Sequence, residues 1–190
     1  MNNIYVAIVH YPVYDINKKI IVSSIVPYDI VDMSRACRTF GVKKFFIVHP
    51  FKAQRETVKR IINFWTKEKG SFYNEDRKEA LKLVEIKRNL NDVLKEIEKI
   101  ENKKPKIILT SARKYEENIN YEFLKSLILT DPIIILFGTG WGIVKEKIRY
   151  DYILEPISGF PEDNEYNHLT VRSACSIMLD RICNLFRRSS

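Results

Sequence analysis

Three segments in the last third of the chain combine glycine and small residues with the ends of apolar runs. The run Ile133–Phe137 leads into residues 138–142, Gly-Thr-Gly-Trp-Gly, and the run Tyr152–Leu154 leads into a loop containing residues 157–159, Ile-Ser-Gly. The third segment, residues 169–172, has the pattern of a first helical turn. Ligands in open α/β sheets bind outside the carboxyl ends of strands, where glycine lets backbone amides come close. The three segments therefore predict one cofactor pocket.

Two familiar nucleotide motifs do not fit the glycine loop at residues 138–142. The dinucleotide fingerprint needs G-x-G-x-x-G after the first strand, whereas here the third glycine comes one residue early and the loop follows a late strand. A P-loop needs Gly-Lys-Ser/Thr, and none follows. The plain alternative is that these glycines only make a tight turn.

Short apolar runs alternate with amphipathic segments through the rest of the chain, which predicts βαβ units. Strands are expected at residues 4–9, 20–26, 45–48, 83–86 and 107–110. Helices are expected from Pro27 to Phe40 with Asp29 as N-cap, at residues 53–69, from the N-cap Asn91 to Ile100, and at residues 121–129, while residues 71–78 read as a polar loop. This pattern predicts a single α/β domain over residues 1–190, with a mostly parallel sheet covered by helices on both faces.

The net charge is +8, from 32 Lys+Arg against 24 Asp+Glu. Such an excess favours a polyanionic partner such as nucleic acid, although a Lys-rich composition with solvated surfaces explains it equally well. The three cysteines form no Cys-x-x-Cys pair, which argues against a disulfide framework and a metal site. The sequence shows no signal peptide and no apolar run of about 20 residues, so we expect a cytoplasmic protein without a membrane span.

The three C-terminal segments resemble those of the SPOUT superfamily of S-adenosylmethionine-dependent RNA methyltransferases. LFGTGWGI is similar to the first cofactor loop of that superfamily, LEPISGF to the second, and NHLTVRSACSIMLDRI to the final loop and helix. Upstream, DIVDMSRACRTFGVKKFFIVHP resembles the N-terminal motif of the TrmH-like branch. The whole chain looks closest to a bacterial group of stand-alone SPOUT proteins, related to the TrmH-like and TrmD-like branches.

The resemblance implies a C-terminal trefoil knot, a homodimer, S-adenosylmethionine as cofactor, and tRNA or rRNA as the substrate. Chain threading of this kind is rare, and periodicity alone does not predict it. The cofactor-binding residues that the resemblance implies are Leu136, Gly138, Thr139, Gly140, Gly142, Ile157, Ser158, Gly159, His168, Leu169, Thr170 and Val171.

On the acceptor side, the resemblance implies Arg35, Asp29 and His168 as catalytic candidates. Arginine is a poor base at its normal pKa, so Arg35 is expected to activate the acceptor electrostatically and to contact phosphate. Each residue also has a plain reading: a surface helix residue for Arg35, a helix cap for Asp29, and a structural histidine for His168. The RNA-binding candidates are Arg35, Arg38, Lys43, Arg113 and Arg172.

Two departures from the TrmH-like pattern leave the methylated atom open between ribose 2′-O and a base. The second motif of that branch carries a Glu that is absent beside Gly138-Thr139-Gly140, and Asp29 stands where that branch has Asn. Two other hypotheses stay in play. One is a catalytically silent SPOUT-fold protein that binds RNA or a nucleotide, and the other is a flavodoxin-like nucleotide-binding enzyme.

Overall fold

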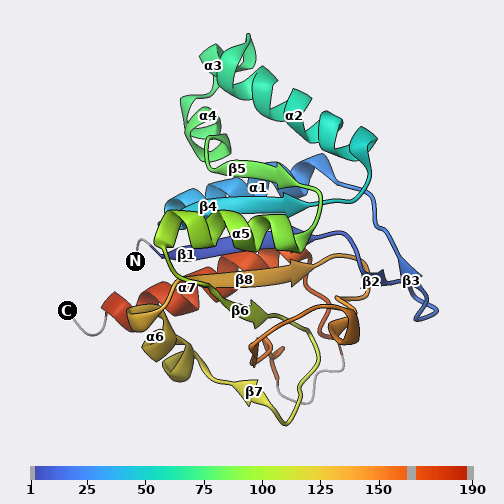
Figure 1. Ribbon diagram of the computed structural model, residues 1–190, viewed down its shortest axis with the longest axis vertical. Helices are drawn as coiled ribbons and strands as arrows, with labels where there is room; N and C mark the ends of the chain where they lie inside the picture. The colour runs from blue at the N-terminus through green and yellow to red at the C-terminus, as the bar shows by residue number, and fades with distance from the viewer. Residues whose placement is uncertain (1–2, 162–165, 188–190) are drawn as a thin grey trace.

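A seven-stranded parallel sheet forms the centre of the computed structural model, which describes residues 3–161 and 166–187. Every strand pairs with its neighbours in parallel. In spatial order the strands are β5 (Val84–Lys87), β4 (Lys44–Val48), β1 (Ile4–Val9), β8 (Ile133–Gly138), β6 (Lys106–Leu109), β9 (Tyr152–Leu154) and β7 (Asn118–Ile119). A small antiparallel hairpin, β2 (Val13–Tyr14) and β3 (Ile20–Ile21), stands apart from this sheet (Figure 1).

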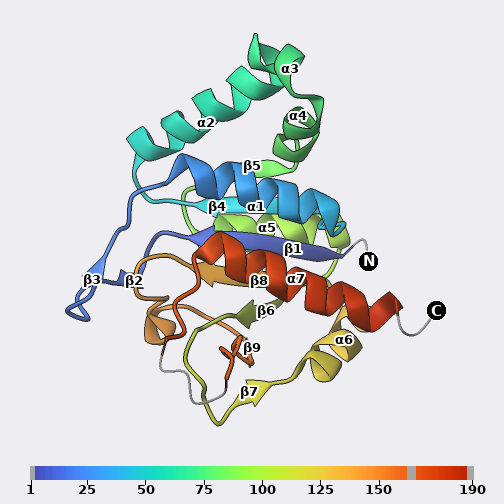
Figure 2. The ribbon, with the colours of Figure 1, turned by 180° about the vertical axis from the view of Figure 1, so that it is seen from behind.

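Helices cover both faces of the sheet, as the sequence predicts. On one face α1 (Pro27–Thr39) and α7 (Val171–Arg187) lie side by side (Figure 2), and α5 (Leu90–Glu101) covers the other (Figure 1). The remaining helices are α2 (Lys52–Lys67), α3 (Gly70–Tyr73), α4 (Glu75–Leu81), α6 (Tyr121–Thr130) and the 3-10 turn η1 (Lys145–Lys147). No helix in the described part of the chain is long and apolar enough to cross a bilayer.

The core is divided into two layers by the alternation of side chains along the strands. In β1, Ile4, Val6 and Ile8 pack toward α1 and α7, while Tyr5 and Ala7 pack toward α5. All six residues of this strand are buried. Because β1 is a parallel strand that is buried on both faces, it lies at the centre of the sheet. Its carboxyl end and the loop that follows it therefore lie in the middle of the molecule.

The strand and helix expectations are confirmed except at four places. Asn89, not Asn91, caps α5, because its side chain accepts the Asp92 amide at 2.9 Å. Asp29 lies inside the first turn of α1 and makes no cap hydrogen bond, since Pro27 begins the helix.

The other two differences are a strand that is shorter than expected and an expected loop that is mostly helical. The run from Ile20 forms only β3, because the next residues lead away toward α1. The supposed polar loop at residues 71–78 is mostly helical: α3 occupies its start, and Asn74 caps α4 by accepting the Arg77 amide at 2.8 Å. Asparagine is a favoured N-cap residue, so Asn74 is the feature of the sequence that indicates the start of this helix.

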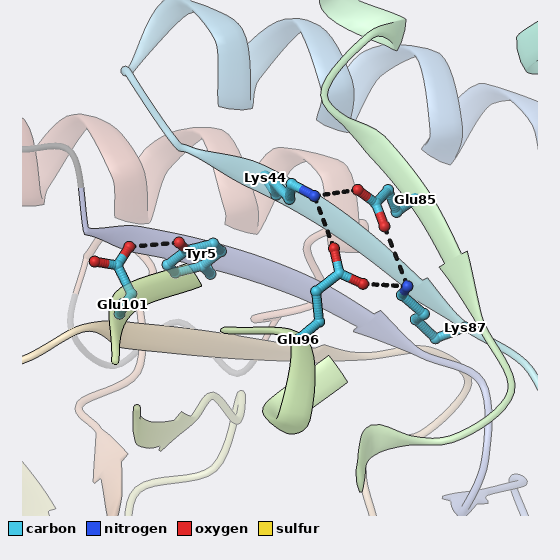
Figure 3. Close-up of polar contacts among 6 residues, drawn as sticks. All are labelled: Tyr5, Lys44, Glu85, Lys87, Glu96 and Glu101. Carbon is cyan, nitrogen blue, oxygen red and sulfur yellow. Dashed lines mark hydrogen bonds and ion pairs between the residues drawn. The ribbon is translucent and has the colours of Figure 1, made fainter. Parts of the chain in front are cut away.

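A ring of four alternating charges joins β4, β5 and α5 on one face of the sheet (Figure 3). Glu96 bridges Lys44 at 2.7 Å and also pairs with Lys87, and both lysines contact Glu85. Hydrogen bonds from Lys44 and Lys87 outweigh burial and lower the pKa of Glu96 to about 2.

We expect Glu96→Gln to destabilise the protein by about 1 kcal/mol at pH 7, because networked ion pairs are worth more than isolated surface pairs. The folded pKa of Glu96 lies below its ordinary value, so its contribution is present at neutral pH and is lost as the pH falls from about 4.5 toward 2. Urea unfolding of the two proteins at pH 7 and in 1 M salt measures this effect. An unchanged free energy of unfolding would contradict the prediction, as would a loss that salt does not reduce.

Candidate cofactor and RNA site

A cavity of about 710 Å³ lies at the carboxyl ends of the central strands. It is bounded by the loops after β6 and β8, by the start of the loop after β9, by the segment before α7, and by the segment that enters α1. Its lining residues are Ser23, Ser24, Val26, Asp29, Thr110, Ser111, Ala112, Arg113, Phe137, Gly138, Thr139, Gly140, Trp141, Gly142, Ile157, Asn167, His168, Leu169, Thr170, Val171, Arg172, Ala174 and Met178.

The glycine loop after β8 is folded tightly against the strand β2. Trp141 donates its amide to the Tyr14 carbonyl at 2.9 Å, and the Tyr14 amide donates to the Gly142 carbonyl at 2.9 Å. Gly140 has φ +58°, and a Cβ there would lie 2.7 Å from the Tyr14 oxygen. A Cβ on Gly138 would likewise lie 2.7 Å from Ile143 Cγ1. These two contacts explain why the loop needs glycine where it does.

The segment before α7 closes the cavity from another side. Asn167 Nδ2 donates to the Ile157 carbonyl at 2.8 Å, which joins this segment to the loop after β9. Thr170 Oγ1 accepts the Ser173 amide at 3.3 Å at the start of α7. The exposed ring of His168 lies edge-on to Trp141, with 6.1 Å between ring centroids. The three predicted loops therefore do converge on one cavity.

A charged pair lies on the cavity wall where α1 meets α7. Asp29 as a residue is 8% exposed, and its carboxylate accepts a hydrogen bond from Arg172 Nη1 at 3.2 Å. Arg172 Nε also pairs with Asp32 at 3.3 Å. Burial raises the pKa of Asp29, and the hydrogen bond and charge of Arg172 oppose that rise. The carboxylate is thus a stronger proton acceptor than an exposed aspartate.

Two buried histidines, each directly after a strand, hold the segment that enters α1. His49 Nδ1 accepts the Phe51 amide at 3.1 Å, so its other nitrogen, Nε2, carries the proton and donates to the Ser23 carbonyl at 3.0 Å. His10 Nδ1 contacts Ser23 Oγ at 3.0 Å. Ser23 Oγ in turn contacts Thr139 Oγ1 in the glycine loop. The histidines therefore fix one wall of the cavity through Ser23.

The cavity brings together most of the residues that sequence reasoning selected. Those on its wall are Asp29, Arg113, Gly138, Thr139, Gly140, Gly142, Ile157, His168, Leu169, Thr170, Val171 and Arg172. Ser23, Asn167 and Trp141 were overlooked as lining residues. The signal for Ser23 was weak, because its position depends on His10 and His49, which follow two different strands.

Six selected residues lie away from the cavity wall. Leu136 is fully buried in β8, and its carbonyl is taken by the amide and hydroxyl of Thr110 at 3.1 and 2.8 Å. Ser158 and Gly159 belong to the loop after β9, but only Ile157 of that loop lines the cavity, because its side chain turns inward to the core. The other three are the basic residues Arg35, Arg38 and Lys43.

The helix geometry explains why Arg35 is separated from Asp29. Six residues along α1 correspond to a rotation of about 600°, so the two side chains emerge on different faces, about 9 Å apart along the axis. Arg35 is exposed. Arg38 lies in the last turn of α1, and Lys43 pairs with Glu101 at 2.8 Å beyond that turn, at the amino ends of the strands. The five basic candidates therefore do not form one patch.

The lining suits a ligand with both apolar and polar parts. A volume of about 710 Å³ falls in the range of small-molecule cofactor sites. Phe137, Ile157 and Met178 offer apolar contacts, and the glycine loop offers backbone amides and carbonyls. Among the described residues, no group of three or more His, Cys, Asp or Glu is arranged to hold a metal ion.

Comparison with known proteins agrees with this arrangement. The family described as SAM-dependent RNA methyltransferase matches residues 3–184. An uncharacterized protein of Aquifex aeolicus is 39% identical over 183 residues, which make up 95% of this chain and 88% of that protein. A tRNA (guanine-N(1)-)-methyltransferase of Oleidesulfovibrio alaskensis is 34% identical over 181 residues. That match covers 95% of this chain but 42% of the relative, so the chain spans less than half of that protein.

The solved structure of the TrmH/SpoU tRNA modifying enzyme of A. aeolicus has the same fold, with a TM-score of 0.60. The match covers 100% of this chain and 78% of that chain at 17% identity, so it bears on the fold alone. The mostly parallel sheet with helices on both faces is thus the SPOUT architecture, while the knot stays a prediction. Taken with the family match over residues 3–184, the chain belongs to the family of S-adenosylmethionine-dependent RNA methyltransferases.

Proposed function

We propose that the 710 Å³ cavity binds S-adenosylmethionine and that the chain methylates a base of a structured RNA, with tRNA as the first substrate to test. The observation that carries this proposal is the Asp29–Arg172 pair, which lies on the same cavity wall as the three converging loops. A cofactor pocket and a potential proton acceptor thereby share one cavity.

The cofactor supplies a methyl group on a cationic sulfonium, so the chain's main task is to position the acceptor. The backbone groups of Gly138, Gly140 and Gly142, together with the side of Ile157, would hold it without buried countercharges. Arg172 would keep the Asp29 carboxylate oriented toward the acceptor.

Asp29 is the residue that we assign to proton removal. An acceptor atom that carries a proton must lose it for methylation to give a neutral product, and a carboxylate with a raised pKa is suited to receive it. A purine ring nitrogen loses its proton much more readily than a ribose hydroxyl does. An aspartate in this position therefore supports base methylation over ribose 2′-O-methylation. The relative named as a tRNA guanine methyltransferase supports the same choice, although the chain matches only 42% of it.

We expect Asp29→Asn to lower the rate of methyl transfer to unmodified tRNA by about 100-fold or more, the usual contribution of a positioned base. Affinity for S-adenosylhomocysteine, measured by calorimetry, should stay within about twofold, because the amide keeps the shape of the carboxylate. The rate is measured with radiolabelled S-adenosylmethionine.

Asp32→Asn is the matched control, since Asp32 also pairs with Arg172 but does not line the cavity. Equal losses in the two variants would assign the effect to Arg172 and contradict a base role for Asp29. Cofactor binding without any transfer by the unaltered chain, to tRNA or to rRNA, would favour the silent, RNA-binding alternative.

We also propose a cytoplasmic homodimer in which Arg35 serves the partner's cavity. Arg35 is exposed on α1, and it lies too far round that helix to face the cavity of its own chain. Leu169, which lines the cavity, is 46% exposed, and Tyr28, next to Asp29 in the chain, is 71% exposed; a second copy would cover both. The trefoil knot belongs to the same proposal.

A further inference from the structure

A second cavity, of about 360 Å³, adjoins the first at the glycine loop and at the loop after β6. The two cavities share Thr110, Ser111, Arg113, Trp141 and Gly142. The second cavity alone is also bounded by the hairpin of β2 and β3 and by the turn η1. A ligand in one cavity could therefore be joined to a ligand in the other past Arg113 and Trp141.

The walls of the second cavity combine cations with aromatic rings. Its cations are Lys18, Arg113 and Lys145, and its rings are Tyr14, Tyr115 and Trp141. Its one carboxylate, Glu146, accepts a hydrogen bond from the Tyr14 hydroxyl at 3.2 Å. This composition is typical of surfaces on which nucleic-acid bases stack while cations hold the phosphates.

Two of the three cations are available for an anion. Lys145 is engaged, because it pairs with Glu117 at 3.0 Å and lies 4.1 Å from the centroid of the Tyr115 ring. The ion pairs found in residues 3–161 and 166–187 include neither Lys18 nor Arg113. The cavity thus offers two positive charges, Lys18 and Arg113, that no ion pair among the described residues engages.

The local backbone holds both of these residues in place. Lys18 occupies the tip of the hairpin with φ +59°, and its amide donates to the Asp15 carbonyl at 3.1 Å. The Asp15 carboxylate accepts hydrogen bonds from the backbone amides of the residues before and after Lys18, at 2.9 and 2.7 Å. The Arg113 amide donates to Ser111 Oγ at 3.0 Å. Because the backbone of both residues is already fixed, less conformational entropy is lost when an anion binds.

We infer that the second cavity binds the nucleotide of the RNA substrate next to the one that is methylated. This inference rests on the proposed function and deepens it. The base of the neighbouring nucleotide stacks on Trp141 or Tyr115, and Trp141 is 50% exposed. The phosphate between the two nucleotides lies at Arg113, which both cavities share, and the next phosphate lies at Lys18.

The chain provides a matched pair of double variants for the test. Lys18→Glu with Arg113→Glu changes two residues of the second cavity, whereas Lys19→Glu with Lys114→Glu changes their exposed neighbours, which do not line it. The change in net charge is the same in both. We expect affinity for bulk tRNA at 0.1 M salt to fall about 30-fold in the first and less than about threefold in the second.

The salt dependence and the cofactor affinity supply two further readouts. The slope of log K against log salt should become shallower by about 1.5 in the cavity variant only, since two phosphate contacts are removed. Affinity for S-adenosylhomocysteine should be unchanged in the Lys19→Glu, Lys114→Glu variant and in a single Lys18→Glu variant, because none of these residues lines the first cavity. Photocrosslinking of thiouridine-substituted tRNA should attach RNA to peptides that contain Trp141 or Tyr115.

Equal losses of tRNA affinity in the two double variants would overturn the inference, because they would show a general effect of charge. Loss of S-adenosylhomocysteine binding in the single Lys18→Glu variant would overturn it too, by assigning this cavity to the cofactor, since Lys18 lines only the second cavity. Absence of tRNA binding by the unaltered chain would have the same consequence. Selective loss of tRNA binding, with no methyl transfer by the unaltered chain, would support the second cavity and contradict the proposed function.

Discussion

Gly140→Ala is expected to weaken S-adenosylhomocysteine binding by at least about 100-fold. Gly140 has φ +58°, and the added Cβ would lie 2.7 Å from the Tyr14 carbonyl oxygen. That oxygen belongs to backbone and also accepts the Trp141 amide at 2.9 Å, so it cannot move without opening the glycine loop. The loop would shift by more than the few tenths of an ångström that a positioned ligand tolerates. Calorimetric titration of both proteins measures the loss.

Gly41→Ala is the matched control for this experiment. Gly41 has a similar φ, +68°, but an added Cβ would meet nothing within 4 Å, and the residue lies just after α1, away from the cavity. Both variants bear the backbone cost of alanine in the left-handed region, about 1 kcal/mol. Only Gly140→Ala adds the clash. Similar binding by the two variants would show that the glycine loop does not shape the cofactor site.

The sequence predicted the sheet well because buried parallel strands are nearly continuous apolar runs. The bounds of β1 and β9 agree with expectation to the residue, and those of β4, β6 and β8 agree to within one residue at either end. The two shortest strands outside the apolar runs, β2 and β7, have two residues each and leave too little pattern to detect. Helix α4 was overlooked because its charged residues resemble those of a loop.

The position of the cavity was predicted because two glycine-containing loops follow apolar runs and so mark the carboxyl ends of strands. The third segment has the pattern of a first helical turn. What the sequence could not show is which side chains meet there across the fold. The pairing of Asp29 with Arg172 joins residues 143 positions apart, and its contact depends on how α1 lies against α7. Ser23 is another case, since it acquires its place from His10 and His49. Side chains whose partners lie in distant elements carry no local signature.

Mild acid is expected to destabilise the protein through His10. Burial, together with the charge of His49, lowers the pKa of His10 to about 4, and the Ser23 contact only partly opposes this. The folded pKa therefore lies below the unfolded value near 6.5, so the fold prefers the neutral ring. The resulting stability is complete above about pH 6.5 and is lost as the pH falls toward 4.

The size of this effect follows from about 1.4 kcal/mol for each pKa unit. Between pH 6.5 and pH 5 the loss should be about 2 kcal/mol, and it reaches about 3 kcal/mol near pH 4. The pKa of His49 is also lowered, chiefly by burial, so His49 adds to the loss. The raised pKa of Asp29 acts in the opposite direction. Comparison with His10→Asn isolates the share of His10, because Asp29 and His49 are present in both proteins.

Urea unfolding between pH 7 and pH 5 measures the prediction, and the three histidines of the chain supply its control. His10→Asn should be less stable than the wild type at pH 7, but its free energy of unfolding should fall by about 2 kcal/mol less on acidification to pH 5. His168→Asn, which alters an exposed ring, should show the full wild-type dependence. If the free energy of unfolding of His10→Asn fell with pH as steeply as that of the wild type, the pKa of His10 would not be lowered by folding, and the prediction would be wrong. Since His10 holds Ser23, and Ser23 contacts Thr139 in the glycine loop, cofactor affinity should weaken over the same pH range.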